Sequence, residues 1–200
     1  MATAHLAKDV PKSLTPPANA HQLRVGLIRT AWNEGLVLSL HDRCKAVLTA
    51  VMEETSKAAS ASTPSDGNTH HNIREEIVAG SFELPYAAQK MAASGSVDVV
   101  LCFGVLVKGD TMHFEYISQA VSNGLMEVQL RTGVPVIYGV LNCLTVEQAQ
   151  QRCGPQSPLP TSLALTALNM AALKVSSSSR CSTYCSTCSN KSAPLRKANL

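Results

Sequence analysis

Three short clusters of polar and aromatic residues each follow a run of apolar residues. Trp32-Asn33 follows the first run, Gly80-Ser81-Phe82-Glu83 the second, and Lys108 to His113 the third. The face of an indole can pack against a flat ring, and a carboxylate can accept hydrogen bonds from hydroxyl groups. An imidazole titrates near neutral pH and can move protons. The clusters therefore hold the side chains needed to bind a polar ring and transfer protons.

The segments between and around these clusters have alternating strand and helix patterns. Four apolar runs predict strands, and the spacing of apolar residues predicts helices between them. The predicted strands are 23–29, 73–78, 97–105 and 134–141. The predicted helices are 35–54, 82–93, 113–132, a short one after Thr145, and 159–175, with a low-complexity loop at 55–72. Pro85 fits the first turn of its helix, and Gly133 ends the long one.

This alternation predicts an α/β fold. We expect a three-layer αβα sandwich with a four-stranded parallel, flavodoxin-like sheet, because the crossovers are long enough for parallel pairing. Ligands bind at the carboxyl ends of the strands in such sheets. All three clusters fall at those ends, and Tyr138 lies near the end of the fourth strand. The pattern favours a functional site at the edge of the sheet where the carboxyl ends of the strands meet, although polar loops also occur at both ends of any sheet.

The length and composition of the chain indicate how many domains it has. The 200 residues suit one domain, and aromatics make up only 4%, so the core must be built from Ala, Val, Leu and Ile. We expect a mobile N-terminal arm at 1–22, a folded domain at 23–175, and a disordered basic Ser/Cys-rich tail at 176–200. The tail has four basic residues and no acidic one, whereas the whole chain has a net charge of +3. This distribution argues against a basic nucleic-acid-binding face.

The sequence has neither a membrane-length apolar stretch nor the apolar block of a signal peptide. Four of the seven cysteines lie within apolar or helical patterns, as reduced thiols usually do. A cytoplasmic location is therefore expected, with no membrane partner. Neither G-x-G-x-x-G nor a P-loop pattern is present, which argues against a nucleotide-binding α/β domain.

Four blocks of sequence resemble the signature blocks of lumazine synthases, in the family's order and with similar spacing apart from the longer loop at 55–72. The resemblance runs from about Arg24 to Gly154, roughly two-thirds of the chain. The blocks are Ala31-Trp32-Asn33-Glu34, Gly80-Ser81-Phe82-Glu83-Leu84-Pro85, Lys108-Gly109-Asp110-Thr111-Met112-His113-Phe114-Glu115-Tyr116 and Glu147-Gln148-Ala149-Gln150-Gln151-Arg152-Cys153-Gly154.

The resemblance implies a reaction of riboflavin biosynthesis. In it, 5-amino-6-(D-ribitylamino)uracil condenses with 3,4-dihydroxy-2-butanone 4-phosphate to give 6,7-dimethyl-8-ribityllumazine, water and inorganic phosphate. The family uses no metal or organic cofactor. Its members assemble as homopentamers, sometimes packed into larger shells, and each active site is shared between neighbouring subunits.

The resemblance also implies roles for single residues. His113 is expected to be catalytic, as the proton-transfer residue of a condensation through an imine. The pyrimidine and its ribityl chain are expected to contact a set of side chains and backbone groups from all four strand ends. That set is Trp32, Ser81, Phe82, Glu83, Val105, Leu106, Val107 and Tyr138.

Two parts of the chain are expected to contact the phosphate group. Asp110 and Thr111 lie just before a helix, where backbone N–H groups attract anions, and Thr111 adds a hydroxyl. Arg152 matches the family's phosphate-binding arginine and could bind it bidentately. Lys108 is expected to be solvated.

The match to the family fails after Gly154. Lumazine synthases usually continue with a Gly-rich loop containing a Lys or His, whereas residues 155–163 have no basic residue. A non-catalytic lumazine- or flavin-binding oligomeric scaffold therefore remains an alternative to the enzyme. The spacing of Cys181, Cys185 and Cys188 resembles that of iron–sulfur motifs. It lies in a Ser-rich end without the rest of such a motif, and His70-His71 has no partner at ligand spacing, so no metal is expected.

Overall fold

The computed structural model describes residues 14–60 and 72–182. The strands are β1 (Val25–Thr30), β2 (Ile73–Val78), β3 (Val99–Val107) and β4 (Val136–Cys143). The helices are α1 (Glu34–Ser60), α2 (Leu84–Ala93), α3 (His113–Thr132), α4 (Val146–Cys153) and α5 (Leu159–Ser182), with short 3-10 turns at Ala20–Gln22 and Ser81–Glu83.

The four strands form one parallel sheet in the order β2-β1-β3-β4. Val25 of β1 pairs with Ile73 of β2 and with Val99 of β3, and Val100 of β3 pairs with Val136 of β4. This order is that of the flavodoxin-like sheet, so the predicted fold class is confirmed. Because all strands run the same way, their carboxyl ends meet at one rim.

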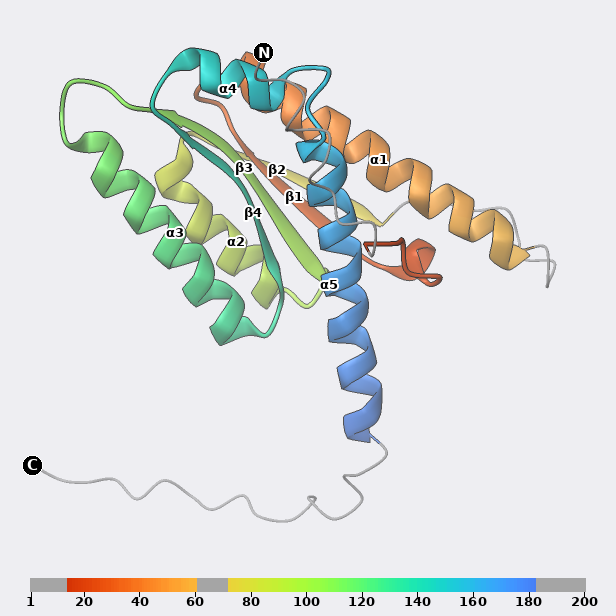
Figure 1. Ribbon diagram of the computed structural model, residues 1–200. Coiled ribbons are helices and arrows are strands. Elements are labelled where there is room, and N and C mark those ends of the chain that lie inside the picture. The colour runs from red at the N-terminus through yellow and green to blue at the C-terminus, as the bar shows by residue number, and fades with distance from the viewer. Residues whose placement is uncertain (1–13, 61–71, 183–200) are drawn as a thin grey trace, which may run out of the picture.

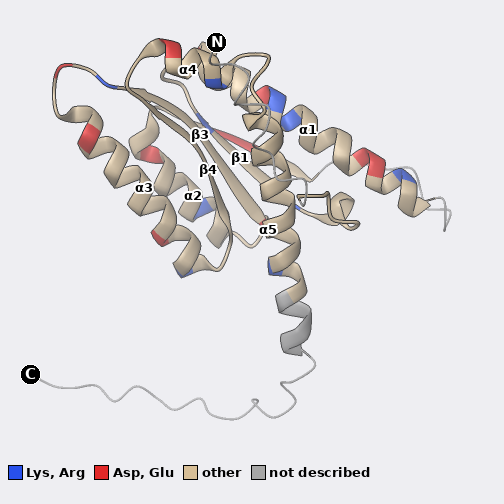
Figure 2. Ribbon diagram, in the orientation of Figure 1, with Lys and Arg blue, Asp and Glu red and all other residues tan. Residues whose placement is uncertain are grey.

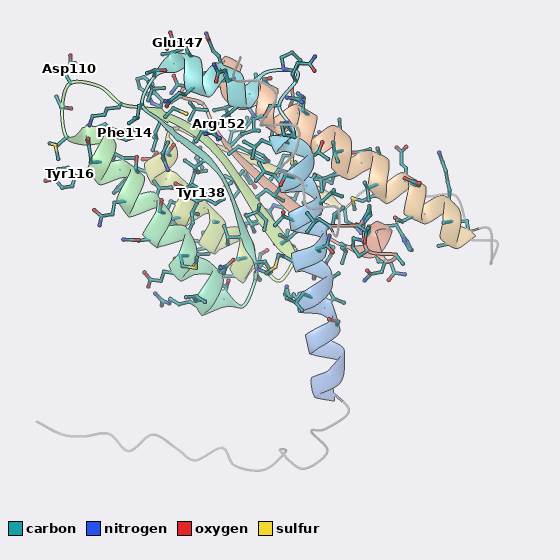
Figure 3. All side chains as sticks on the ribbon, viewed as in Figure 1. Asp110, Phe114, Tyr116, Tyr138, Glu147 and Arg152 are labelled. Atoms are coloured by element: carbon teal, nitrogen blue, oxygen red, sulfur yellow. The ribbon has the colours of Figure 1, made fainter. Side chains whose placement is uncertain are left out.

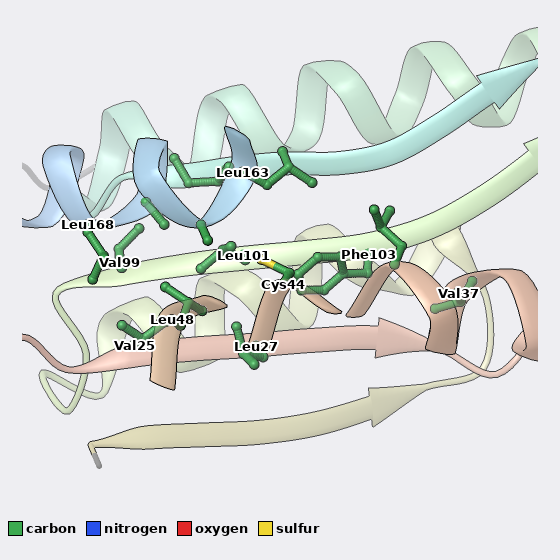
Figure 4. Close-up of a cluster of buried hydrophobic side chains, with 14 of the residues drawn as sticks. Val25, Leu27, Val37, Cys44, Leu48, Val99, Leu101, Phe103, Leu163 and Leu168 are labelled. Carbon is green, nitrogen blue, oxygen red and sulfur yellow. The ribbon is translucent and has the colours of Figure 1, made fainter. Parts of the chain in front are cut away.

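Helices cover both faces of the sheet (Figure 1). Side chains of α1, α4 and α5 pack on one face, and those of α2 and α3 pack on the other. Figure 4 shows the first core, in which Phe103 is the only labelled aromatic ring among aliphatic side chains and Cys44. The aliphatic core expected from the composition is therefore present.

The buried thiols predicted from the apolar patterns are also present. Cys44, Cys102, Cys143 and Cys153 are free and buried. Burial raises the pKa of the Cys44 thiol to about 12 and that of Cys153 to about 11. These thiols are therefore protonated at neutral pH and pack as small apolar groups.

Several element boundaries follow from local chemistry. Gly133 adopts a left-handed conformation, with φ of 65°, and ends α3 where the sequence predicts. Thr145 caps α4, because its Oγ1 accepts a hydrogen bond from the Gln148 N–H. Pro85 lies in the first turn of α2. The predicted bounds of β2 and α3 coincide with those observed.

Other boundaries differ from the prediction. Helix α1 continues to Ser60, because helix-forming Lys57, Ala58 and Ala59 lie in its last turn. The first part of the predicted 55–72 loop is therefore helical, and 61–71, with His70-His71, lies outside the described residues. Strand β3 extends to Val107 rather than Val105.

Both ends of the folded region also extend further than predicted. Ala20, inside the predicted arm, is fully buried, and the Asn169 amide of α5 donates to the Thr15 carbonyl at 3.0 Å. Helix α5 continues to Ser182, past the predicted end at Val175, and Ser176 bonds its hydroxyl to the Leu173 carbonyl. Residues 1–13 and 183–200, with Cys185 and Cys188, lie outside the described part of the chain.

Across residues 14–60 and 72–182, no three metal-ligating side chains come together. In the same ranges, no helix combines the length and apolarity needed to span a bilayer.

An ion-pair network ties the amino ends of the strands together. The Arg24 guanidinium donates to both carboxylate oxygens of Asp98, at 3.1 and 2.7 Å, and Lys174 of α5 lies 3.7 Å from the same carboxylate. Burial alone would raise the pKa of Asp98, but the hydrogen bonds and charges of Arg24 and Lys174 outweigh it and lower that pKa. This network fixes the end of the sheet opposite the rim.

Candidate functional site

The loop after β1 is fixed to both neighbouring strands. The Ala31 and Trp32 N–H groups donate to the Val78 and Ala79 carbonyls beyond β2, and the Asn33 amide donates to the Val105 carbonyl of β3 at 2.8 Å. Asn33 adopts a positive φ of 57°, a conformation that Asn tolerates better than most residues. The backbone of Trp32 is therefore held in place while its indole remains 72% exposed.

The turn after β2 packs closely against β3. The Oγ of buried Ser81 lies so near Gly104 that a β-carbon there would come within 2.7 Å of it. Gly80 donates its N–H to the Glu83 carboxylate at 2.9 Å, and a β-carbon on Gly80 would lie 3.5 Å from the Trp32 ring. The turn therefore lies beside the indole, as the sequence predicts.

The other predicted pocket residues near this turn differ in how deeply they are buried. Phe82 is 60% exposed, which leaves its ring free for a ligand or a neighbouring chain. Val105 is buried and contributes its carbonyl to Asn33, whereas Leu106 and Val107 are half-buried at the end of β3. The three residues after Gly104 thus form an apolar strand end beside Asn33, and their contact with the pyrimidine stays a prediction.

The loop between β3 and α3 is held by an ion pair. Lys108 Nζ lies 2.7 Å from Glu115 Oε1, and this hydrogen bond lowers the pKa of the Glu115 carboxyl. Lys108 is exposed, as expected of a solvated side chain, and its charge is also paired with Glu115. The Lys108 N–H also donates to the Cys143 carbonyl of β4, which extends the sheet pairing into the loop.

The candidate proton-transfer and phosphate residues follow Lys108. Asp110, Thr111 and His113 are exposed, with Asp110 at the tip of the loop (Figure 3). The Thr111 hydroxyl oxygen accepts the His113 N–H at 3.4 Å, which leaves its own O–H free to donate. His113 begins α3, and α3 packs against the Ser81–Glu83 turn.

Tyr138 lies further from the rim than predicted. It is the third residue of β4, and its hydroxyl is hydrogen-bonded to Ser122 Oγ of α3 and to the Asn142 amide, both at 2.8 Å. Its ring lies on the β4–α3 side of the molecule and is 36% exposed (Figure 3). Among the described residues, no hydrogen bond connects Tyr138 with Trp32 or with the turn at Ser81.

Arg152 is exposed in the last turn of α4. It lines a shallow hollow of about 270 Å³ with Asn142, Gln148 and Gln151. The described residues offer its guanidinium neither a hydrogen bond nor an ion pair, so the charge is available for an anion. This hollow shares no lining residue with the hollow beside Trp32, and Asp110 and Arg152 lie on different elements (Figure 3).

The predicted site residues, together with Asn142, therefore fall into two groups within one chain. We call the first the β1–β3 rim, comprising Trp32, Ser81–Glu83, residues 105–107 and residues 110–113. We call the second the β4–α4 edge, comprising Tyr138, Asn142 and Arg152.

A model of the 6,7-dimethyl-8-ribityllumazine synthase family matches residues 22–175, more than half of the chain. The chain belongs to this lumazine synthase family.

Three relatives with this name are similar to the chain. The lumazine synthase of Deinococcus radiodurans is 33% identical over 68% of this chain and 77% of its own length. That of Pyricularia oryzae is 35% identical over 66% of this chain and 76% of its own length. That of Prochlorococcus marinus is 34% identical over 78% of this chain and 91% of its own length.

Two residues that hold the site in this lumazine synthase family member were missed by sequence reasoning. Asn33 has a positive φ, and its amide donates a hydrogen bond to the neighbouring strand β3. In the sequence, only its position next to Trp32 pointed to a role for Asn33. Asn142 connects the Tyr138 hydroxyl to the Arg152 hollow, and nothing in the local sequence indicates that link.

Proposed function

We propose that this chain condenses 5-amino-6-(D-ribitylamino)uracil with 3,4-dihydroxy-2-butanone 4-phosphate. The products are 6,7-dimethyl-8-ribityllumazine, water and inorganic phosphate, which makes the chain a transferase of riboflavin biosynthesis. The observation that carries the proposal is the β1–β3 rim in a member of this family: an exposed indole whose backbone is fixed to β2, beside the turn that holds Ser81 and Glu83.

In the proposed site the pyrimidine stacks on Trp32. The indole is exposed, and its backbone is already ordered, so little backbone entropy is lost on binding. Phe82 and the end of β3 at Val105, Leu106 and Val107 give the ring an apolar border. One Glu83 oxygen accepts the Gly80 N–H, which leaves the other to accept a ribityl hydroxyl.

His113 transfers the protons in this scheme. Attack of the substrate's amine on the ketone forms a carbinolamine, and loss of water gives an imine, so protons must leave nitrogen and reach oxygen. An exposed imidazole at the start of α3, next to the anion-binding turn at Asp110 and Thr111, is suited to that transfer. The scheme uses neither a metal nor an organic cofactor.

We propose that the phosphate is held by the backbone N–H groups at Asp110 and Thr111 together with Arg152 of a neighbouring subunit. Arg152 lines a hollow that has no lining residue in common with the hollow beside Trp32, which supports a site completed by a second subunit. Tyr138 would reach the pyrimidine from the same neighbour.

Exposed apolar side chains support assembly. Leu130 is 75% exposed, and Tyr86, Tyr116 and Leu144 are each more than 60% exposed. The described part of α5 is almost without charges, whereas α1 carries several of both signs (Figure 2). Such surfaces are typical of subunit interfaces, and the proposed assembly is a homopentamer.

The experiment is a direct assay. Purified full-length protein is mixed with both substrates, and lumazine fluorescence is followed against the uncatalysed reaction. Faster formation supports the enzyme. No acceleration, with the pyrimidine still bound, contradicts it and leaves the binding scaffold.

A further inference from the structure

An arginine of α1 bonds to the backbone at the end of α4 and at the start of the segment that departs from the family pattern. Both terminal nitrogens of Arg43 donate to backbone carbonyls just after α4. One nitrogen bonds to Cys153 at 3.4 Å and, more closely, to Gly154, and the other bonds to Pro155 at 3.0 Å and Ser157 at 2.8 Å. Four carbonyl oxygens of this short segment therefore converge on a single guanidinium.

A second residue of α1 strengthens the same attachment. Ser39, one helical turn before Arg43, donates its hydroxyl to the Cys153 carbonyl at 2.7 Å. Helices α1 and α4 lie against each other at the rim end of the sheet (Figure 1). The Cys153 side chain is itself buried in the core. The carboxyl end of α4 is thus fixed through both its backbone and its last side chain.

Arg152 is the residue immediately before this fixed point. Its peptide bond leads directly into Cys153, so the direction in which its side chain leaves α4 depends on how that helix ends. A positive group at the carboxyl end of a helix also satisfies carbonyls that have no partner within the helix. Arg43 supplies that group for α4.

Arg43 does not serve as a phosphate ligand itself. Each terminal nitrogen of its guanidinium already donates to two carbonyls, and the side chain is half-buried. Arg152, by contrast, is exposed and makes no hydrogen bond or ion pair with the described residues. One arginine therefore holds the backbone, and the other presents a free charge.

We infer that Arg43 is a positioning residue for phosphate recognition, acting through the end of α4 on Arg152. This inference rests on the proposed function, in which Arg152 binds the phosphate of the four-carbon substrate. The Arg43 hydrogen bonds thereby hold the start of a segment with three prolines between 155 and 160.

The test compares four full-length proteins: wild type, Arg43→Gln, Arg152→Ala and the double variant. Arg43→Gln should raise the KM for the butanone phosphate about tenfold while the KM for the pyrimidine stays unchanged, because only the phosphate contact is misplaced. On the Arg152→Ala background the same change should raise that KM less than about twofold, since the side chain through which Arg43 acts is gone. Additive effects, or an unchanged KM for the phosphate substrate, would overturn the inference.

Two further variants separate positioning from stability. Arg43→Lys keeps the charge but has one nitrogen for four carbonyls, so its KM should fall between those of wild type and Arg43→Gln. Asp98→Ala weakens the network at the opposite end of the sheet and should lower the Tm without changing the KM for the phosphate substrate. If Arg43→Gln behaves like Asp98→Ala, Arg43 is only a structural residue and the inference is wrong.

Calorimetric titration of the same proteins with inorganic phosphate tests the inference without turnover. Arg43→Gln and Arg152→Ala should weaken phosphate binding in the same way. If the wild type forms no lumazine but this pattern holds, the proposed function fails and the positioning role stands. If the wild type is active and Arg43→Gln binds phosphate normally, the inference alone fails.

Discussion

The β1–β3 rim and the β4–α4 edge are built in different ways. Around the rim, backbone hydrogen bonds from Ala31 and Trp32 and the amide of Asn33 connect three adjacent strands, so its geometry follows directly from the sheet. At the edge, Arg152 lies on a short helix whose end is held by side chains of α1. The part of the site that would contact the ring is fixed by the fold, whereas the position of Arg152, one of the proposed phosphate ligands, depends on a few long-range side-chain contacts.

The largest expected effect comes from the rim's proton-transfer residue. His113→Ala should lower kcat on the order of 10²- to 10⁴-fold, as loss of a general acid–base group does. The Kd of the pyrimidine should stay close to that of the wild type, because Trp32 and the Ser81–Glu83 turn are untouched.

Added imidazole should restore part of the turnover of His113→Ala. An equal loss of turnover and pyrimidine binding, measured by stopped-flow assay and calorimetry, would assign His113 to binding instead and remove the chemical step from the rim.

A smaller effect is expected from the indole. Trp32→Ala should weaken pyrimidine binding by about 2 kcal/mol, or roughly thirty-fold in Kd, because stacking on an aromatic ring contributes about that much. Trp32→Phe keeps a flat ring and should lose only part of that affinity. The KM for the butanone phosphate should not change in either variant, and a change there would mean that the two regions are not separate.

The smallest effect on either KM is expected at the amino ends of the strands. Asp98→Ala leaves Arg24 and Lys174 without their carboxylate and should cost about 2 kcal/mol of folding free energy in urea titrations, because Arg24 is partly exposed to water. Both KM values should remain those of the wild type. A shift in either would show that the far end of the sheet is coupled to the site.

The network of Arg24, Asp98 and Lys174 also makes the folding stability depend on pH. Because the pKa of Asp98 is lowered in the folded chain, its contribution is complete at neutral pH and is lost as the pH falls below about 3.9, the ordinary value for a free Asp. The wild type should therefore lose more stability than Asp98→Ala between neutral pH and about pH 3. Parallel curves for the two proteins would contradict this.

Sequence patterns predicted the fold because its signals are local. The apolar run of β3, the start of α3 at His113 and its end at Gly133 each depend on neighbouring residues. The end of α1 was predicted too early, because Ser- and Ala-rich sequence is compatible with both loop and helix.

Contacts between distant segments could not be predicted in the same way. Asn33 bonds to Val105, and Arg43 bonds to Cys153, 110 positions away in the sequence. Neither contact has a sequence pattern of its own. Family blocks therefore predict which residues compose the candidate site, but the contacts that hold Trp32 and Arg152 in place required the structure.

The measurement that tests the shared site most directly is subunit complementation. His113→Ala and Arg152→Ala each impair every site in a uniform assembly, one through the β1–β3 rim and the other through the β4–α4 edge. When the two chains are co-expressed and purified as mixed assemblies, about a quarter of the interfaces should combine an intact rim with an intact edge. Lumazine formation should then rise well above that of either variant alone. Activity no higher than the average of the two separate variants would place both groups in the same chain's site and contradict the account.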